Sequence, residues 1–235
     1  MNNNFSILTT KSLKPYIKEQ LVNKDFNVLE HDFIRLEEVK NNEFNSILNT
    51  HLANYIFTSK NAVRFFIEKA GDNKININKK AFFCALSGET QKALLDEGFT
   101  VNIVADNAAD LAKKIIKERS FTEYIFFCGD KRRHELPDLL KNGGVAVLEQ
   151  VLYKNIEQSK KIDSNFQAIM FFSPSAVQSF FDKNVLPKNT TCFCIGYTTA
   201  NALKNYKISN KIIVSNYPSQ QNMVDVLLNY FNIKN

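Results

Sequence analysis

The chain has 235 residues, of which 44% are hydrophobic and 20 are phenylalanine, so it can fill the cores of one large or two modest domains. An excess of 30 basic over 24 acidic residues gives a net charge of +6, which favours anionic partners. The two signs are interspersed, and no like-charged block exceeds Lys131-Arg132-Arg133. A nucleic-acid partner is therefore not expected, whereas a small polyanion fits the charge at least as well.

Several other classes are disfavoured. No apolar run approaches the ~20 residues of a membrane span, and residues 1–5 do not begin a secretory signal, so we expect no membrane partner. The four cysteines lie in apolar, strand-like runs, which is typical of buried thiols in a reducing compartment. The three histidines lack metal-ligand spacing, so we expect no metal and no other cofactor. These features together predict a cytoplasmic protein.

The first part of the chain alternates apolar runs with amphipathic stretches. The expected extended segments are Phe5–Thr9, Asn27–Leu36, Tyr55–Phe57, Ala81–Leu86, Val101–Val104 and Tyr124–Phe127. The expected helices between them are Pro15–Val22, Glu43–His51, Asn61–Ala70, Thr90–Glu97 and Asn107–Arg119. Gly71 is expected to cap the third helix at its C-terminus, and Asn107 with Asp110 resembles an N-terminal capping pair.

The remainder of the chain continues the alternation. Pro137 is expected near the start of a short helix that Gly143-Gly144 ends, and Val145–Tyr153 is extended. The later strands are Ala168–Phe172, Thr191–Ile195 and Lys211–Val214, and the helices after them are Ser175–Asp182, Thr198–Asn205 and Gln221–Tyr230. Short, continuously apolar strands that alternate with helices are typical of parallel sheets covered on both faces. The predicted fold class is α/β.

Two segments are repeated in the same order. Phe57–Phe66 (FTSKNAVRFF) resembles Phe171–Phe180 (FFSPSAVQSF), and Ser87–Leu94 resembles Gly196–Leu203. The offsets are similar, 114 between the paired serines (173 − 59) and 109 between the paired threonines (199 − 90). Such long offsets indicate two copies of one βα unit, because solenoid repeats run about 20–50 residues.

Two long segments of mixed polarity, Glu30–Glu37 and Val147–Lys154, differ from the short buried strands. If they pair side by side, the chain leaves one lobe near residue 36 and returns near residue 153. We therefore expect two similar flavodoxin-like lobes with parallel sheets, joined by a two-strand linker. The first lobe would comprise residues 1–35 and 155–235, and the second residues 36–154.

Hydroxyl-rich turns follow several predicted strands. They are Thr58-Ser59, Ser87-Gly88 with Thr90, Ser173-Pro174-Ser175, and Gly196 with Thr198 and Thr199. Ligands of parallel sheets bind beyond the carboxyl ends of the strands, where helix N-termini offer unpaired N–H groups to anions. Taken singly, each turn is better explained as a helix cap than as a ligand site. The two matched pairs together favour a ligand cleft between the lobes.

The remaining candidates are few. The basic segment Gly129–His134, which includes Arg132, could bind carboxylates or be a solvated loop. No nucleophile elbow, phosphate loop or dinucleotide fingerprint is present, and the adjacent Ser59 and Lys60 would point in different directions. Tyr153, on the second long segment, is the candidate proton donor.

The ordered motifs resemble the uroporphyrinogen-III synthase family over nearly the whole chain. They are Ile7–Thr10, the F-T-S-x-N-A-V match at Phe57–Val63, the turn at Ser87–Thr90, the basic Gly129–Arg133, Tyr153, the F-S-P-S-A-V match at Phe172–Val177 and the I-G-x-T-T-A match at Ile195–Ala200. Two positions depart from the family pattern: Ser87 stands where Gly is usual, and Tyr197 where Pro is frequent. These departures bear on the local carboxylate contacts more than on the fold.

The resemblance implies a two-lobed monomer that cyclises hydroxymethylbilane, a linear tetrapyrrole octacarboxylate, to uroporphyrinogen III. Water is lost and ring D is inverted through a spiro intermediate, whereas unassisted closure gives the uninverted isomer. The protein would act mainly by orienting the chain ends. Tyr153 would assist departure of the hydroxyl, and the hydroxyl-rich turns with Arg132 would bind substrate. The alternative is a non-catalytic two-lobed binder of small polyanions.

Overall fold

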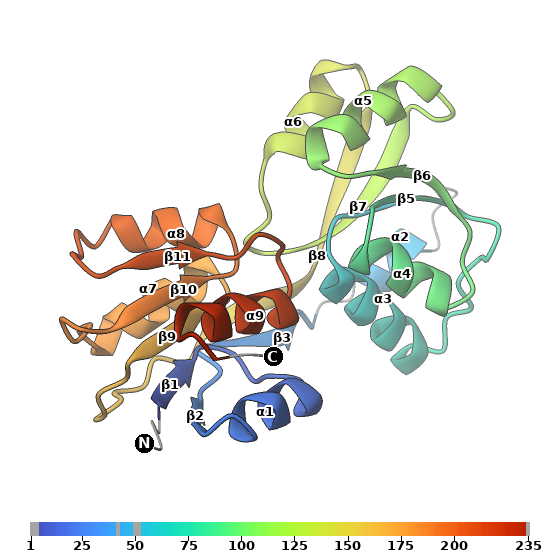
Figure 1. Cartoon of the computed structure of the whole chain (residues 1–235). Helices are drawn as coiled ribbons and strands as arrows, with labels where there is room; N and C mark the ends of the chain where they lie inside the picture. Colours follow the sequence, from blue (N-terminus) through green and yellow to red (C-terminus); the bar gives the residue numbers. More distant parts are fainter. Residues whose placement is uncertain (1–4, 41–42, 49–52, 234–235) are drawn as a thin grey trace. The chain divides into compact units, whose positions relative to one another are not determined.

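The computed structural model describes residues 5–40, 43–48 and 53–233, which form two compact units (Figure 1). Unit 1 comprises Met1–Arg35 and Ile156–Asn235, and unit 2 comprises Leu36–Asn155. In each unit strands and helices alternate along the chain, so the α/β prediction is confirmed.

Unit 1 is built on a five-stranded sheet in which every strand pairing is parallel. Its elements are β1 (Phe5–Thr9), α1 (Pro15–Val22), β2 (Phe26–Glu30), β9 (Ala168–Phe171), α7 (Pro174–Lys183), β10 (Thr191–Cys194), α8 (Tyr197–Lys204), β11 (Ile212–Val214) and α9 (Gln220–Tyr230). The spatial order β2-β1-β9-β10-β11 is 2-1-3-4-5 when the strands are numbered along the chain, which is the flavodoxin-like order.

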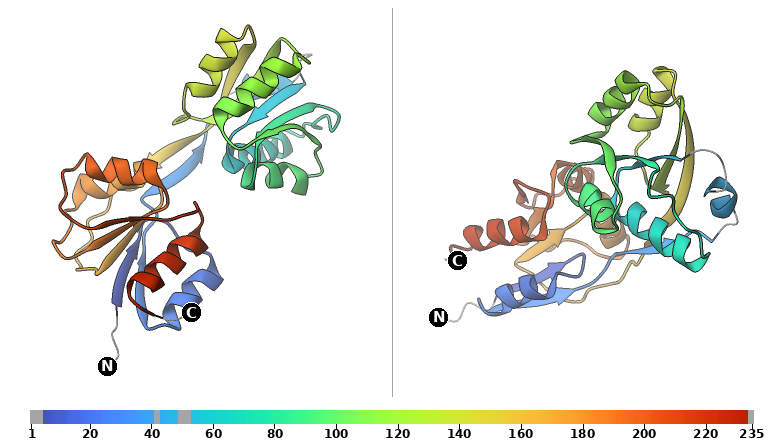
Figure 2. Two further views of the ribbon diagram at one scale, coloured as in Figure 1. Left: turned by 45° about the horizontal axis from the view of Figure 1, so that its top comes forward. Right: turned by 90° about the vertical axis from the view of Figure 1, so that its right-hand side faces the viewer.

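Alternating side chains of these strands pack into two separate cores in unit 1. Leu8 and Phe171 face α7 and α8, whereas Ile7 and Met170 face α1 and α9. The two helix pairs lie on opposite faces of the sheet (Figure 2). The strands are continuously apolar because both of their faces are covered.

Unit 2 has a six-stranded sheet in the order β3-β8-β7-β4-β5-β6. Its elements are β3 (Ile34–Glu38), α2 (Glu43–Leu48), β4 (Asn54–Phe57), α3 (Lys60–Asp72), β5 (Phe82–Leu86), α4 (Glu89–Asp96), β6 (Val101–Ala105), α5 (Ala108–Glu118), β7 (Glu123–Gly129), α6 (Glu135–Asn142) and β8 (Ala146–Glu157). Phe57 and Phe127 face a core with α2, α3 and α4, and Tyr124 and Phe126 face α5 and α6.

The two units have the same spatial order of strands, but the strands follow one another along the chain in a different sequence. In unit 2 the order β8-β7-β4-β5-β6 corresponds to β2-β1-β9-β10-β11 of unit 1. The repeated turns of the sequence therefore follow equivalent strands: β4 and β9 for the first repeat, β5 and β10 for the second. The strand pair that comes first along the chain in unit 1 comes last in unit 2.

Strands β3 and β8 are sheet neighbours, so the two long segments pair as expected. The Val39 N–H donates to the Leu152 carbonyl (2.9 Å), and the Gln158 N–H donates to the Phe33 carbonyl (2.8 Å). Phe33 thus lies opposite Gln158, and Val39 lies opposite Leu152. Since residue numbers rise along β3 while those of its partners on β8 fall, this pairing is antiparallel.

Three local expectations need correction or restriction. Gly71 does not cap α3, which continues to Asp72 with Asn73 at its C-cap. The single extended segment 27–36 is interrupted at residues 31–33 and contributes to two strands, β2 and β3. The predicted end of the helix at His51 lies outside the described residues, which include α2 only as Glu43–Leu48.

Candidate active site

The carboxyl end of β4 in unit 2 carries the first predicted turn. Ser59 is the N-cap of α3, and its Oγ accepts a hydrogen bond from the Asn61 N–H (3.1 Å). Thr58 and Ser59 are half-buried between the end of β4 and the helix. When these five strands are numbered along the chain, their spatial order β6-β5-β4-β7-β8 reads 3-2-1-4-5. The turn lies where this order reverses, which is the usual ligand position of such sheets.

Tyr153 of β8 lies against this turn. Its hydroxyl is 3.3 Å from the Ser59 Oγ, and its ring stacks on Phe65 of α3 with centroids 5.1 Å apart and planes 18° apart. Only 7% of Tyr153 is exposed. The structure thus brings two of the predicted site residues, Ser59 and Tyr153, into contact.

Gly129 and Asp130, at the end of β7, complete the surroundings of Tyr153. A Cβ on Gly129 would lie 2.6 Å from the Tyr153 Cε2 and Cζ atoms, so only glycine leaves room for the ring. The Asp130 N–H donates to the Tyr153 carbonyl (3.0 Å). The Asp130 carboxylate in turn accepts from the main chain (3.0 Å) and the side-chain amide (2.7 Å) of Asn155. Asp130 therefore fixes the backbone from Tyr153 to Asn155.

The environment of Tyr153 keeps its hydroxyl protonated at neutral pH. Burial is the main cause that raises the pKa of the phenol, and nearby Cys128 and Asp130 raise it further. Hydrogen bonds from the side chains of Ser59 and Asn61 oppose this rise, because they stabilise the phenolate. The group can therefore donate a proton to a ligand but is not ionised beforehand.

The second predicted turn of unit 2, after β5, has an acidic environment. The Ser87 Oγ donates to the Asp106 carboxylate (2.7 Å), and Gly88, with φ of +75°, is the N-cap of α4. Glu89 lies in the first helical turn and accepts from Lys60 (2.7 Å). Thr90 is buried in the helix. A carboxylate ligand at this turn would be opposed by Glu89 and Asp106.

Arg132 is already paired in the described structure. Its Nε donates to the Glu149 carboxylate of β8, and this hydrogen bond raises the pKa of the guanidinium. Both side chains are about three-quarters buried. The pair fastens the loop after β7 to the neighbouring strand, so Glu149 neutralises the charge that Arg132 would offer a ligand.

In unit 1 the first repeated turn follows β9. Ser173 is the N-cap of α7, with its Oγ accepting from the Ala176 N–H (3.0 Å), and Ser175 is half-buried beside it. Thr10, at the end of β1, donates its hydroxyl to the Met170 carbonyl (3.0 Å) and accepts from the Phe172 N–H (3.2 Å). Thr10 thereby joins β1 to β9 at the point where the strand order reverses, a role that the sequence motifs did not reveal.

The second turn of unit 1 follows β10. Gly196 is the N-cap of α8 in extended conformation, Thr199 is buried in the helix, and Thr198 is exposed. Tyr197, at the first helical position, is 77% exposed. The first turns of α7 and α8 carry no acidic residue, so these helices do not themselves place a carboxylate at the positive ends of their dipoles.

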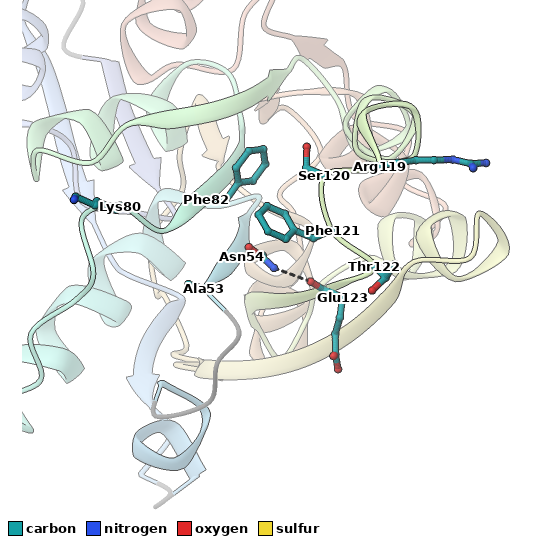
Figure 3. A pocket seen from close by; sticks show the side chains of 9 residues that line it. All are labelled: Ala53, Asn54, Lys80, Phe82, Arg119, Ser120, Phe121, Thr122 and Glu123. Carbon is teal, nitrogen blue, oxygen red and sulfur yellow. Dashed lines mark hydrogen bonds between the residues drawn. The ribbon is translucent and has the colours of Figure 1, made fainter.

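A pocket of about 580 Å³ lies at the amino ends of the strands of unit 2, away from the turns described above (Figure 3). Asn54, Phe82 and Glu123, the first residues of β4, β5 and β7, belong to its lining. Phe82 and Phe121 contact each other edge to face (5.1 Å), and the Asn54 amide donates to the Glu123 carbonyl (3.2 Å). None of the predicted site residues lines this pocket.

The described part of the chain has neither a metal-binding cluster nor a membrane-spanning helix. Residues 5–40, 43–48 and 53–233 contain no cluster of three or more His, Cys, Asp or Glu side chains arranged to hold a metal. Across the same ranges, no helix combines the length and apolar character needed to span a membrane.

The family model described as uroporphyrinogen-III synthase HemD matches residues 15–225. The chain belongs to the uroporphyrinogen-III synthase family. The crystal structure of uroporphyrinogen-III synthetase from Helicobacter pylori is similar, with a TM-score of 0.71 and 19% identity over 96% of this chain and 99% of that one. A mutant uroporphyrinogen III synthase from the extremely thermophilic bacterium Thermus thermophilus has a TM-score of 0.66 and 16% identity over 97% and 99%. A search of curated protein sequences gives no significant match.

Proposed function

We propose that this protein converts hydroxymethylbilane to uroporphyrinogen III, with inversion of ring D and loss of water. The family match over residues 15–225 is the observation that carries the proposal. A lyase that releases water is the reaction class that follows. The excess of basic residues agrees with a polycarboxylate substrate.

Tyr153 is the proposed proton donor. As the C–O bond of the hydroxymethyl group breaks, the electron pair leaves with oxygen and the phenol proton completes a water molecule. The remaining carbocation is delocalised over its pyrrole and is attacked by the far end of the chain. A protonated, buried phenol suits this step, because the raised pKa keeps the proton in place until the substrate hydroxyl accepts it.

Orientation of the substrate is the larger part of the proposed catalysis. Unassisted closure gives the uninverted isomer, so the protein must fix which carbon of ring D meets the cation. We propose that hydroxyls and main-chain N–H groups at the carboxyl ends of the strands bind the substrate carboxylates. The proposed binding residues are Thr58, Ser59, Ser87, Thr90, Arg132, Ser173, Ser175, Gly196, Thr198 and Thr199. No acidic residue lies in the first turn of α3, α7 or α8, whereas Glu89 lies in the first turn of α4, so the turns before α3, α7 and α8 suit a carboxylate better than the turn before α4.

The proposal includes the organisation of the chain. Residues 1–35 with 155–235 would form one lobe of the enzyme and residues 36–154 the other, each contributing binding residues. We further propose that the enzyme acts as a cytoplasmic monomer. Limited proteolysis tests the partition: cleavage that releases a compact fragment 1–110 would contradict it, whereas a protected core spanning residues 36–154 would support it.

Multiple-turnover product analysis tests the reaction. Freshly made hydroxymethylbilane is incubated with catalytic amounts of protein, oxidised, and resolved into type I and type III isomers beside a protein-free control. The proposal predicts type III product in large molar excess over protein. Type I product at the control rate would contradict it and would favour a non-catalytic binder of polyanions.

A further inference from the structure

The hydroxyl groups of Tyr153 and Ser59 form a pair whose donor and acceptor roles can be assigned. They are 3.3 Å apart, and either oxygen could be the donor. The Ser59 Oγ already accepts the N–H of Asn61, which uses one of its acceptor positions (3.1 Å). A serine hydroxyl has one proton to donate, and the phenol oxygen is the partner within reach of it.

The proton count favours Ser59 as the donor in the reacting state. When Ser59 donates to the phenol oxygen, the phenol proton is left for a ligand. After Tyr153 has transferred that proton, its oxygen can only accept hydrogen bonds. Because only 7% of Tyr153 is exposed, water is a poor source of them, and a phenolate without a donor would be costly in this site.

We propose that Ser59 is a positioning residue for Tyr153, whose hydroxyl donates to the phenol oxygen and stabilises the phenolate formed as the substrate hydroxyl leaves. This inference rests on the proposed function and adds a second protein group to the proton-transfer step. Atoms balance: the phenol proton and the departing hydroxyl form water, the C–O electron pair goes to that water, and the phenolate regains a proton when the cyclised product loses one from carbon.

The neighbours of Tyr153 act consistently with this role. The Asn61 side chain also forms a hydrogen bond that lowers the pKa of the phenol, as Ser59 does. Cys128 and Asp130, from β7 and the loop after it, act in the opposite direction. Phe65 contributes only an apolar ring surface on the side of α3. The two donors therefore come from the first turn of α3 and its cap.

Titration of Tyr153 in the full-length protein tests the inference independently of turnover. The chain has 8 tyrosines and no tryptophan, so phenol ionisation can be followed by ultraviolet difference absorbance. Each protein is compared with its Tyr153→Phe counterpart, which isolates the signal of this residue. Removing a donor from the phenolate raises the phenol pKa, so Ser59→Ala should move the Tyr153 titration to higher pH.

Kinetics provide the second readout. Ser59→Ala should lower kcat about tenfold, the equivalent of one hydrogen bond to a charged group. KM should change less than kcat, because the main-chain N–H groups proposed to bind substrate at this turn are retained. The alkaline limb of the kcat profile should move to higher pH with the titration. Ser59→Thr keeps the hydroxyl and should retain both properties.

Ser219→Ala is the matched control for loss of a helix cap. Ser219 caps α9 by accepting from the Asn222 N–H (3.1 Å) and is remote in sequence from Tyr153. Ser219→Ala should lower the stability of the protein by about as much as Ser59→Ala, without changing turnover or the Tyr153 titration. An unchanged titration in Ser59→Ala would overturn the inference, as would a kcat equal to that of Ser219→Ala. Failure of the wild-type protein to form type III isomer would instead contradict the proposed function, and the titration would still decide the role of Ser59.

Discussion

Replacement of Gly129 by alanine should impair catalysis by displacing the Tyr153 ring. Gly129 does not have a positive φ, so alanine meets no backbone obstacle. The added Cβ would lie 2.6 Å from two ring carbons of Tyr153 and 2.9 Å from its hydroxyl oxygen. Ordinary contacts begin at 3.4 Å, so the Tyr153 ring and the new Cβ must move apart by roughly 1 Å. Overpacked sites relax by shifts of this kind.

The size of the effect follows from that displacement. Moving a catalytic group by about 1 Å costs on the order of 100-fold in rate, and overpacking of this kind costs about 1–3 kcal/mol of stability. The ring cannot shift freely, because it stacks on Phe65 and its hydroxyl contacts Ser59. We therefore expect kcat for type III isomer formation to fall about 100-fold while the protein remains folded.

The assay compares isomer-resolved kcat values well below the melting temperature. Gly143→Ala is the control, because its Cβ would lie 2.4 Å from the Ile116 Cδ1 in the same unit without facing Tyr153. It should lose stability but keep kcat. If Gly129 acts through the ring, adding Gly129→Ala to Tyr153→Phe should lower kcat little further. A Gly129→Ala protein with wild-type kcat would refute the reasoning.

Three further substitutions have defined expectations. Tyr153→Phe should lower kcat by about 10²- to 10⁴-fold with little change in KM, because it removes the proton donor and leaves the binding groups. Lys69→Met should cost about 1–3 kcal/mol in urea unfolding, since Lys69 is buried and donates to the Glu38 carboxylate and the Val39 carbonyl (both 2.7 Å). Phe57→Ala should cost about 3–5 kcal/mol, because its ring is fully buried.

Each of these expectations has a contradicting result. Wild-type kcat in Tyr153→Phe would remove that residue from the mechanism. For Lys69→Met, the matched control is Lys92→Met, which breaks an exposed pair with Asp96 and should lower stability clearly less. Equal losses would refute the role of burial. A loss below about 1 kcal/mol in Phe57→Ala would contradict the inference that its ring fills a tightly packed core.

Much of the fold was predictable because local signals and burial agree. The buried strands are continuous apolar runs such as Phe126-Phe127-Cys128, and the capping pair of Asn107 and Asp110 forms as expected, with the Asp110 N–H donating to the Asn107 side chain (2.9 Å). The cysteines are all free and buried in the described structure. The prediction that Gly71 caps α3 was wrong, because a glycine near a helix end resembles a C-cap. The helix continues for one more residue, to Asp72.

The site was only partly predictable, because its contacts join residues distant in sequence. The motifs indicated Ser59 and Tyr153 separately, but their contact spans 94 positions and depends on the register of β7 with β8. The need for glycine at 129 arises from that same register. The pairing of Arg132 with Glu149 is also non-local, which is why a basic segment alone did not indicate whether its charge was available.

A single-turnover experiment tests the central claim most directly. The protein, in molar excess, is mixed with hydroxymethylbilane, quenched after complete consumption, and the oxidised product is resolved into isomers. If the protein enforces inversion of ring D, type III isomer should account for nearly all of the product. Predominantly type I isomer under the same conditions would contradict the account.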